Sequence, residues 1–300
     1  MASAILLAGG TGFLGRHLLR ALLARGTTVL LVKRSSSRLE PIAELMRDPL
    51  LRTFDLDRIP LESVFAENEV STVINTATRY GRGEPLADVL RANLTFPVDL
   101  LELAGKHRVA QFLNAGTSLP RHLSAYSLAK AQFVEWMERL SGALRCVNLR
   151  LEHFYGSGDH PSKFISWVVR SLLDRCPSLE LTAGTQQRDF VHVDDVVDGI
   201  LRVLEARDRL PEGFQTFELG TGASTTIREV VELIRDCIGN SETRLHFGGV
   251  PFREGEVMIS RADLKAMEQL GWRPRISLRE GLARTVEEER ALSSAGRSPR

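Results

Sequence analysis

The sequence predicts an α/β fold built on a doubly wound parallel sheet, and three observations lead to this prediction. The run Ala4–Ala8 is continuously apolar, as expected of a parallel strand that is covered on both faces. A glycine-rich loop, GGTGFLG at residues 9–15, follows directly, and leucines at helical spacing continue through residues 16–25. Further apolar runs then alternate with segments of helical periodicity. This alternation is typical of a Rossmann sheet wrapped by helices.

The same patterns place the remaining elements and the domains. Strands are expected at 28–32, 52–57, 72–77, 111–117, 146–151, 179–181 and 216–220, and helices at 88–104, 125–137, 163–173, 195–205, 227–238 and 261–270. A dinucleotide-binding domain should span 1–155, with 189–220 returning to it, beside a smaller substrate-binding cap of 156–188 and 221–290 and a flexible tail of 291–300. The site is expected where the cap meets the carboxyl ends of the strands.

Composition limits the possible functions. The 300 residues are 43% hydrophobic and 26% charged, enough for one large or two interlocked globular domains. A net charge of +1 gives no electrostatic reason to expect nucleic acid or an anionic membrane as a partner. The three cysteines are widely spaced and match no disulfide framework or metal motif, which indicates a reducing cytosol and no metal site. No segment reaches the ~20 apolar residues of a membrane span.

The glycine loop is the first candidate binding site. Gly9, Gly12 and Gly15 carry no side chains, so backbone N–H groups and the positive end of the following helix can approach a pyrophosphate. A tight turn would also use glycines. The apolar strand before the loop and the helix after it favour dinucleotide binding.

The end of the second expected strand indicates which dinucleotide is bound. NAD enzymes carry an acid there for the ribose 2′-hydroxyl, whereas this chain has Lys33, Arg34 and three serines. Two cations and hydroxyl groups suit a 2′-phosphate, so NADPH is the predicted cofactor. The alternative is a solvated basic turn.

The second candidate site is a phenol and an ammonium four residues apart, Tyr126 and Lys130. On a helix this spacing puts both side chains on one face, one turn apart. A phenol is a poor acid or base near neutrality, but a neighbouring cation stabilises the phenolate and lowers the pKa. The pair could therefore carry out acid–base chemistry, or Tyr126 could be a half-buried packing residue beside a solvated Lys130.

A hydroxyl residue ends the strand expected at 111–117, nine residues before the tyrosine. Thr117 at this position could hold a substrate carbonyl beside the phenol. Ser118 is the competing residue, and either hydroxyl could instead cap a turn or a helix. We favour Thr117.

Three motifs occur in a fixed order, GGTGFLG at 9–15, YSLAK at 126–130 and RDFVHVDDV at 188–196. With them, the chain from about Ile5 to Glu289 resembles the extended short-chain dehydrogenase/reductases that act on nucleotide-linked sugars. Within that superfamily it is similar to the CDP-paratose and CDP-abequose synthases, NADPH-dependent reductases of a 4-keto-3,6-dideoxyhexose on a nucleoside diphosphate. Segments 75–82, 115–120, 151–156 and 186–190 carry this closer similarity.

The resemblance implies a role for each matched residue. Tyr126 would donate the proton, Lys130 would lower the pKa of Tyr126 and hold the nicotinamide ribose, and Thr117 would replace the more usual serine. The implied cofactor contacts are Gly9, Gly12, Phe13, Leu14 and Gly15 at the pyrophosphate, Asp55 and Leu56 at the adenine, and Ala77 along the cofactor, beside Lys33 and Arg34 at the 2′-phosphate. The implied substrate contacts are Thr78, Thr117, His153, Arg188 and Arg253, with both arginines on the diphosphate.

Three departures from the superfamily affect the substrate side. The segment between Thr117 and Tyr126 is shorter than in most of its epimerases, so a substrate-side loop is missing. His153 stands where those epimerases usually have an asparagine on the diphosphate, and it could instead be a hydrogen-bonded wall residue. The superfamily's dehydratases carry an acid pair directly after the hydroxyl residue, and its absence here argues against dehydration.

The predicted function is an NADPH-dependent 4-ketoreductase of a nucleotide-linked deoxysugar, with hydride delivered to C4 and Tyr126 as proton donor. One alternative is an NAD-dependent epimerase that retains its cofactor; another is a regulatory dinucleotide-binding protein that turns nothing over. Lys33 and Arg34 favour the reductase, and the intact Thr117, Tyr126 and Lys130 argue against a regulatory protein. We expect a cytoplasmic enzyme that could form a homodimer, with no nucleic-acid or membrane partner.

Overall fold

The computed structural model describes residues 3–81 and 83–296, and the chain divides into two compact units. Unit 1 comprises Met1–Leu151 and Ile200–Phe217, and unit 2 comprises Glu152–Gly199 and Glu218–Arg300. Residues 189–199 thus belong to unit 2, whereas the predicted division assigned them to the dinucleotide-binding domain.

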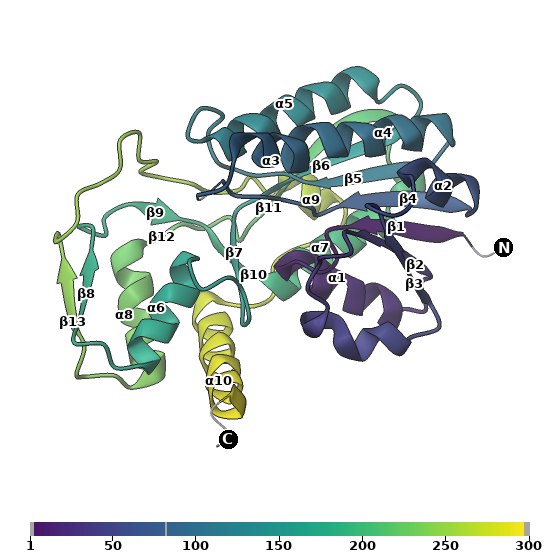
Figure 1. Ribbon diagram of the computed structural model, residues 1–300. Helices are drawn as coiled ribbons and strands as arrows, with labels where there is room; N and C mark the ends of the chain where they lie inside the picture. Colours follow the sequence, from purple (N-terminus) through teal and green to yellow (C-terminus); the bar gives the residue numbers. More distant parts are fainter. Residues whose placement is uncertain (1–2, 82, 297–300) are drawn as a thin grey trace. The chain divides into compact units, whose positions relative to one another are not determined.

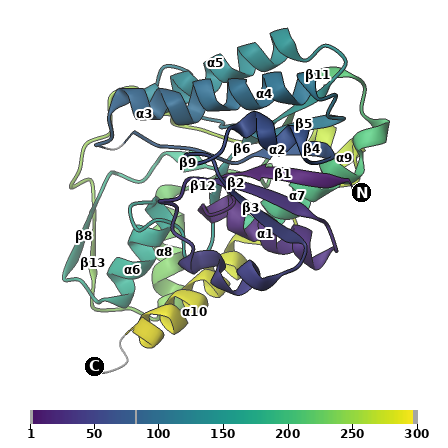
Figure 2. The same ribbon diagram turned by 45° about the vertical axis from the view of Figure 1, so that its right-hand side comes forward.

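A seven-stranded sheet forms the centre of unit 1 (Figures 1 and 2). Its strands are β1 (Ala4–Ala8), β2 (Val29–Lys33), β3 (Leu51–Asp55), β4 (Val70–Asn75), β5 (Gln111–Ala115), β6 (Arg145–Leu151) and β11 (Gly213–Leu219). The order is β11-β6-β5-β4-β1-β2-β3, and the pairings among β1 to β6 are parallel. Strand order therefore reverses between β1 and β4, where doubly wound folds bind ligands. The predicted fold class is confirmed.

Helices cover both faces of this sheet. Helix α1 (Phe13–Ala24) lies on one face and α4 (Phe96–Lys106) and α5 (Ala125–Leu140) lie on the other (Figures 1 and 2). The leucines predicted to form the α1 stripe are buried, because their spacing of three and four residues places them on the face toward β1 and β2. The unit also contains α2 (Leu61–Ala66), α3 (Leu86–Leu90), a π-helical turn (Arg91–Thr95), the 3₁₀ turns Glu40–Arg47 and Arg207–Arg209, and the end of α7 (Val193–Glu205).

Unit 2 is built around three helices that pack together, α6 (Phe164–Leu173), α8 (Ile227–Ile238) and α10 (Leu278–Gly296) (Figure 1). Three two-stranded sheets join them, β7 (His153–Tyr155) with β10 (Phe190–His192), β9 (Gln187–Arg188) with β12 (Thr225–Thr226), and β8 (Ser178–Leu181) with β13 (Arg244–Phe247). A short helix, α9 (Lys265–Gln269), lies within the segment where a longer one was predicted.

Helix α10 was not predicted, and its buried residues explain why. Leu282 and Val286 face inward at a spacing of four, but the same side also buries the polar Thr285 and Glu289. A helix face that includes these polar residues gives no clear apolar periodicity in the sequence. The helix runs to Gly296, so it includes the first residues of the expected flexible tail; residues 297–300 lie outside the described part of the chain.

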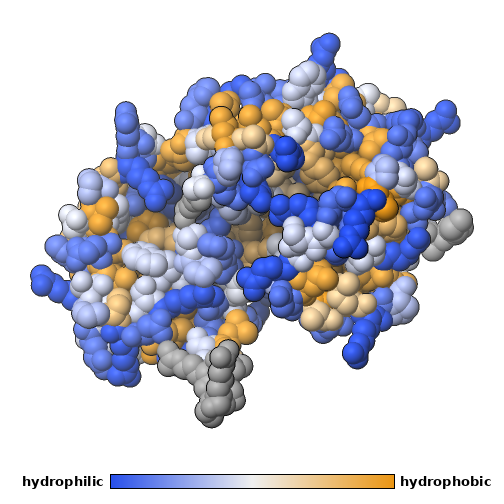
Figure 3. All heavy atoms as spheres, in the orientation of Figure 1, coloured by the Kyte–Doolittle hydropathy of each residue, from blue (hydrophilic) through white to orange (hydrophobic). Residues whose placement is uncertain are grey.

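The helices of the described residues can be compared with what a membrane span requires. No helix in the described residues combines the length and apolarity that a membrane span requires. Hydrophilic residues are spread over the face in Figure 3, with hydrophobic residues between them.

Two glycine-to-alanine changes test how tightly α1 packs on the glycine loop. A Cβ on Gly15 would lie 2.1 Å from the carbonyl oxygen of Gly9, whereas a Cβ on Gly105, in α4, would meet nothing within 4 Å. We expect Gly15→Ala to lower the unfolding free energy by roughly 1–3 kcal/mol through overpacking. Gly105→Ala should raise it by about 0.4–1 kcal/mol, because alanine restricts the unfolded chain. Urea titration measures both, and equal effects would contradict the packing described.

Candidate active site

The glycine loop lies where strand order reverses, directly after β1. Gly9 has a φ of +81°, and a Cβ there would lie 2.5 Å from the backbone nitrogen of Ala77, which follows β4. The Gly12 N–H donates to the Gly9 carbonyl over 2.9 Å and closes the loop onto α1. Helix α1 begins at Phe13, directly after the loop, so the partial positive charge of its N-terminus lies at this point. A side-chain-free loop at a helix N-terminus fits a pyrophosphate.

The two cations at the end of β2 have different surroundings. Lys33 is 7% exposed and forms an ion pair with Asp55, its partner in register on β3. The Leu56 N–H donates to the Lys33 carbonyl over 2.8 Å, which fixes the adjoining turn. Arg34 is exposed, and its guanidinium has no hydrogen-bond or ion-pair partner among the described residues. Of the two predicted 2′-phosphate contacts, Arg34 is therefore the one whose charge is not already paired with a carboxylate.

Three buried asparagines cross the carboxyl ends of β4, β5 and β6. Asn75 donates to Asn114 and Asn114 donates to Asn148, each over 3.0 Å between side-chain amides. The Asn75 side chain also accepts from the Ala77 N–H over 3.2 Å. Buried amides that satisfy one another hold a fixed arrangement, so this ladder positions the turns beside the glycine loop. In each of the three strands an apolar residue directly precedes the asparagine, a repeat that could have revealed the ladder.

Tyr126 lies in the first turn of α5, which starts at a capping box formed by Ser124 and Ser127. Tyr126 is 9% exposed, and the hydroxyls of Thr117 and Thr78 are the polar side chains that act on its phenol. Burial raises the pKa of the phenol above its ordinary value, and these two hydroxyls act in the opposite direction. Thr117, rather than Ser118, is therefore the hydroxyl beside the phenol.

Lys130 is one turn further along α5 and only 3% exposed. Its ammonium donates to the carbonyl of Ala115 over 2.9 Å and to that of Ala77 over 3.4 Å. Burial lowers the pKa of Lys130 to about 8. The expectation that Lys130 lowers the pKa of Tyr126 differs from this structure, where the ammonium is bound to carbonyls and burial raises the pKa of the phenol. The third N–H group of the ammonium has no described partner, so it is free to meet a ligand.

A residue that was not predicted, Asn93, fixes the turn that carries Thr78. It lies in the π-helical turn and is fully buried. The Thr78 hydroxyl donates to its side-chain oxygen over 2.9 Å, while its amide donates to the carbonyls of Arg79 over 2.7 Å and Val89 over 2.9 Å. Thr78 was predicted to bind substrate, and here it joins Asn93 to Tyr126. A π turn inside a helical run has no simple sequence pattern.

The predicted diphosphate residues all belong to unit 2. Arg188 is 8% exposed; its Nη1 donates to the Gln187 carbonyl over 2.8 Å, and its Nη2 forms an ion pair with Glu256. Burial lowers the pKa of the Arg188 guanidinium, and the charges of Glu256 and Glu152 oppose this. Arg253 is exposed in the same loop as Glu256, and its guanidinium has no partner among the described residues.

His153 is partly buried on β7. Its Nδ1 lies 3.5 Å from the Glu152 carboxylate, too far for a hydrogen bond, so this buried ring nitrogen is unsatisfied. Its ring packs edge-on against Phe190 at 5.9 Å between centroids. His153 is therefore a partly buried residue whose ring nitrogen Nδ1 has no hydrogen-bond partner among the described residues.

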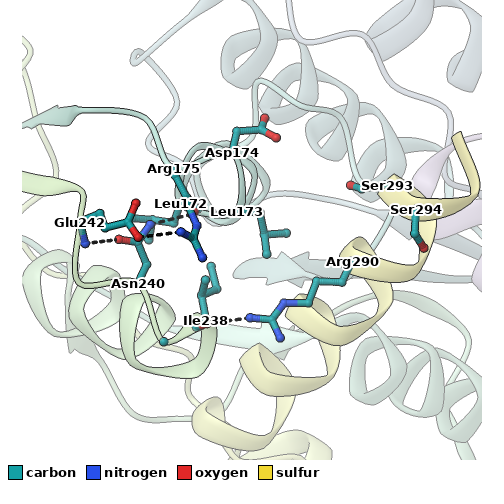
Figure 4. Close-up of a pocket in the computed structure, with 11 residues that line it drawn as sticks. Leu172, Leu173, Asp174, Arg175, Ile238, Asn240, Glu242, Arg290, Ser293 and Ser294 are labelled. Carbon is teal, nitrogen blue, oxygen red and sulfur yellow. Dashed lines mark hydrogen bonds and ion pairs between the residues drawn. The ribbon is translucent and has the colours of Figure 1, made fainter. Parts of the chain in front are cut away.

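A surface cavity of about 570 Å³ in unit 2 contains none of the predicted site residues (Figure 4). It lies where α6 and α8 end, and two of its arginines are already engaged. Arg175 pairs with Glu242 over 2.6 Å, and Arg290 donates to the Ile238 carbonyl over 2.6 Å. Because none of the predicted site residues lines the cavity, we assign it no role in the chemistry of Tyr126.

The model of the NAD dependent epimerase/dehydratase family matches residues 5–220, well over half of the 300 residues. The chain belongs to this family. CDP-abequose synthase of Salmonella typhimurium is 30% identical over 288 residues, which cover 93% of this chain and 95% of that protein. The resemblance inferred from the three motifs is thus confirmed.

Two solved structures share the fold of this epimerase/dehydratase family member. UDP-glucose 4-epimerase from Thermotoga maritima, in a complex with UDP-glucose, has a TM-score of 0.83 at 26% identity and covers 97% of this chain and 99% of its own. MoeE5, in a complex with UDP-glucose and NAD, has a TM-score of 0.80 at 29% identity and covers 97% and 100%.

The pH dependence of stability tests the buried ammonium. The pKa of Lys130 is about 8 in the folded protein against an ordinary 10.5, so between these pH values the unfolded chain binds more protons. The unfolding free energy of the wild type should therefore rise with pH across this window relative to Lys130→Met, by up to about 3 kcal/mol. Urea titrations of both proteins at several pH values measure the difference. Parallel curves would show that Lys130 is not held in a desolvated site.

Proposed function

We propose that the protein is an NADPH-dependent 4-ketoreductase of a nucleotide-linked deoxysugar, of the CDP-4-keto-3,6-dideoxyhexose type. The similarity to CDP-abequose synthase, which extends over 93% of the chain, supports a CDP-linked deoxysugar as substrate. The carrying observation is the placement of the nearly buried Tyr126 beside the Thr117 hydroxyl, one helical turn from the buried Lys130. A proton donor beside a second hydroxyl can receive a carbonyl oxygen.

In this proposal the residues of unit 1 have separate roles. Thr117 orients the C4 carbonyl oxygen of the sugar, and Tyr126 gives it a proton. Lys130 holds the nicotinamide ribose with its free N–H group and compensates the phenolate left on Tyr126. The glycine loop and the N-terminus of α1 hold the pyrophosphate. When bound, the reduced nicotinamide supplies the hydride for C4.

The residues of unit 2 are proposed to bind the nucleoside diphosphate. Arg188 and Arg253 offer planar, permanently charged donors that suit phosphate oxygens. His153 has an unsatisfied ring nitrogen, which suits it to the same role.

An NAD-dependent epimerase is the second candidate, and the Lys33–Asp55 ion pair is the observation that favours it. This pair removes one of the two charges predicted for a 2′-phosphate. The similarity to UDP-glucose 4-epimerase points the same way. The deciding experiment incubates the protein with NADPH and a CDP-linked 4-keto-3,6-dideoxy sugar and, separately, with NAD and UDP-glucose. A reductase consumes one NADPH per product, whereas an epimerase changes the sugar without net cofactor oxidation.

Removing the phenolic hydroxyl tests the proton donor. Tyr126→Phe keeps the ring and its packing, so turnover should fall by roughly 10² to 10⁴ while NADPH affinity changes little. Tyr80→Phe is the matched control, because its ring lies 5.1 Å from that of Tyr126 and loses the same atom. We expect the control to retain most of its turnover. Near-normal turnover of Tyr126→Phe would show that Tyr126 only packs against its neighbours and is not the proton donor.

Cofactor choice should depend on Arg34 more than on Lys33. Arg34→Leu removes free donors, so NADPH binding should weaken about 10-fold or more while NADH binding stays nearly the same. Lys33→Leu leaves Asp55 with only its longer ion pair to Arg58, at 3.9 Å, so it should lower stability and change the NADPH-to-NADH ratio less. Titrations with both cofactors measure these ratios. A wild type that prefers NADH would contradict the assignment of NADPH.

A further inference from the structure

Glu256 forms an ion pair with Arg188, the arginine on which the proposed diphosphate site depends. A guanidinium presents two parallel N–H groups to a phosphate along either of two edges, and Nη2 belongs to both. In Arg188 this Nη2 is the atom that pairs with Glu256, while Nη1 donates to the Gln187 carbonyl over 2.8 Å. A phosphate that approached either edge would therefore meet the Glu256 carboxylate.

The segment that carries Glu256 is hydrogen-bonded to the rest of unit 2 at both of its ends. Between these ends, the described residues hold it through a single ion pair. Before it, the Val250 N–H donates to the Leu181 carbonyl over 3.1 Å; after it, the Gln187 N–H donates to the Met258 carbonyl over 2.7 Å. Residues 251–255 are exposed. Among the described residues, the Arg188–Glu256 pair is the one hydrogen bond or ion pair that joins 251–257 to the rest of unit 2.

Electrostatics explain why the Arg188–Glu256 ion pair forms and why a bound diphosphate would break it. The Arg188 side chain is 9% exposed, and a guanidinium so far from water is costly without a counter-charge. Glu152, whose side chain is 3% exposed, already adds negative charge nearby and accepts from the Ser260 hydroxyl over 2.6 Å. A diphosphate added to two carboxylates would raise the energy of all three through like-charge repulsion.

We propose that Glu256 is an internal substitute for the substrate diphosphate, neutralising Arg188 until a nucleotide displaces it. Displacement frees the segment 251–257, including Arg253, to rearrange around the ligand. Glu256 thus lowers the affinity for the nucleotide, because each binding event must first break an existing ion pair. This inference rests on the proposed function, in which Arg188 binds the diphosphate.

Binding of CDP to the full-length protein tests the sign of this effect. Glu256→Gln keeps the shape of the side chain but removes its charge, so it should bind CDP about 10-fold more tightly than the wild type in calorimetric titrations. Glu254→Gln is the matched control, an exposed acid of the same loop without a described partner, and its affinity should stay near that of the wild type. In an Arg188→Leu background, Glu256→Gln should give no gain.

Two binding outcomes would overturn the proposal. Weaker CDP binding by Glu256→Gln would make Glu256 a ligand of the nucleotide, and unchanged binding would show that the pair persists in the complex. A gain that survives Arg188→Leu would show general charge repulsion instead.

Proteolysis without nucleotide provides a readout that does not depend on the proposed function. If the ion pair holds the segment, trypsin should cleave after Arg253 several-fold faster in Glu256→Gln than in the wild type or Glu254→Gln. Equal cleavage rates would exclude the restraint. A wild type that binds no CDP, together with faster cleavage in Glu256→Gln, would refute the diphosphate site but not the restraint.

Discussion

The ammonium of Lys130 is the interaction on which the rest of the site depends. It lies out of water and donates to the carbonyls of Ala115, the last residue of β5, and Ala77, which follows β4. It therefore joins the carboxyl ends of two strands that are far apart in the sequence. Lys130 and Tyr126 lie on the same helix, α5. The lowered pKa of Lys130, about 8, shows the cost of this position in the cofactor-free protein. A cofactor or a phenolate beside the ammonium would recover part of that cost, so stability and chemistry are linked at one atom.

Much of unit 1 could be predicted from the sequence because its signals are local. A buried parallel strand reads as an apolar run, and the loop at 9–15 needs glycine at each position where backbone meets backbone. The spacing of Tyr126 and Lys130 also follows from helix geometry. The asparagine ladder and Asn93 were missed, because their roles depend on partners 15 to 39 residues away. The direction of the Tyr126 pKa shift was missed for a similar reason, since burial is a tertiary property.

Unit 2 was harder to predict because polar groups do much of its packing. Glu289 is buried in α10, where it accepts from the Gly158 N–H over 2.7 Å and pairs with Arg170 over 3.1 Å. A helix stabilised by such contacts has a weak apolar stripe. Arg188 could be singled out by resemblance, but the partner that occupies it lies 68 residues later and carries no motif of its own. A residue whose role depends on a distant partner is therefore the least visible in a single sequence.

The central claim is that these residues reduce a sugar carbonyl, and isotope transfer tests it most directly. The protein would be incubated with NADPH that carries deuterium at both C4 positions of the nicotinamide and a CDP-linked 4-keto-3,6-dideoxy sugar, and the product examined by NMR. The account predicts deuterium at C4 of the sugar, one label per NADPH oxidised, and almost no labelled product with Tyr126→Phe. A product that carries no deuterium at C4, or equal labelling by the variant, would contradict it.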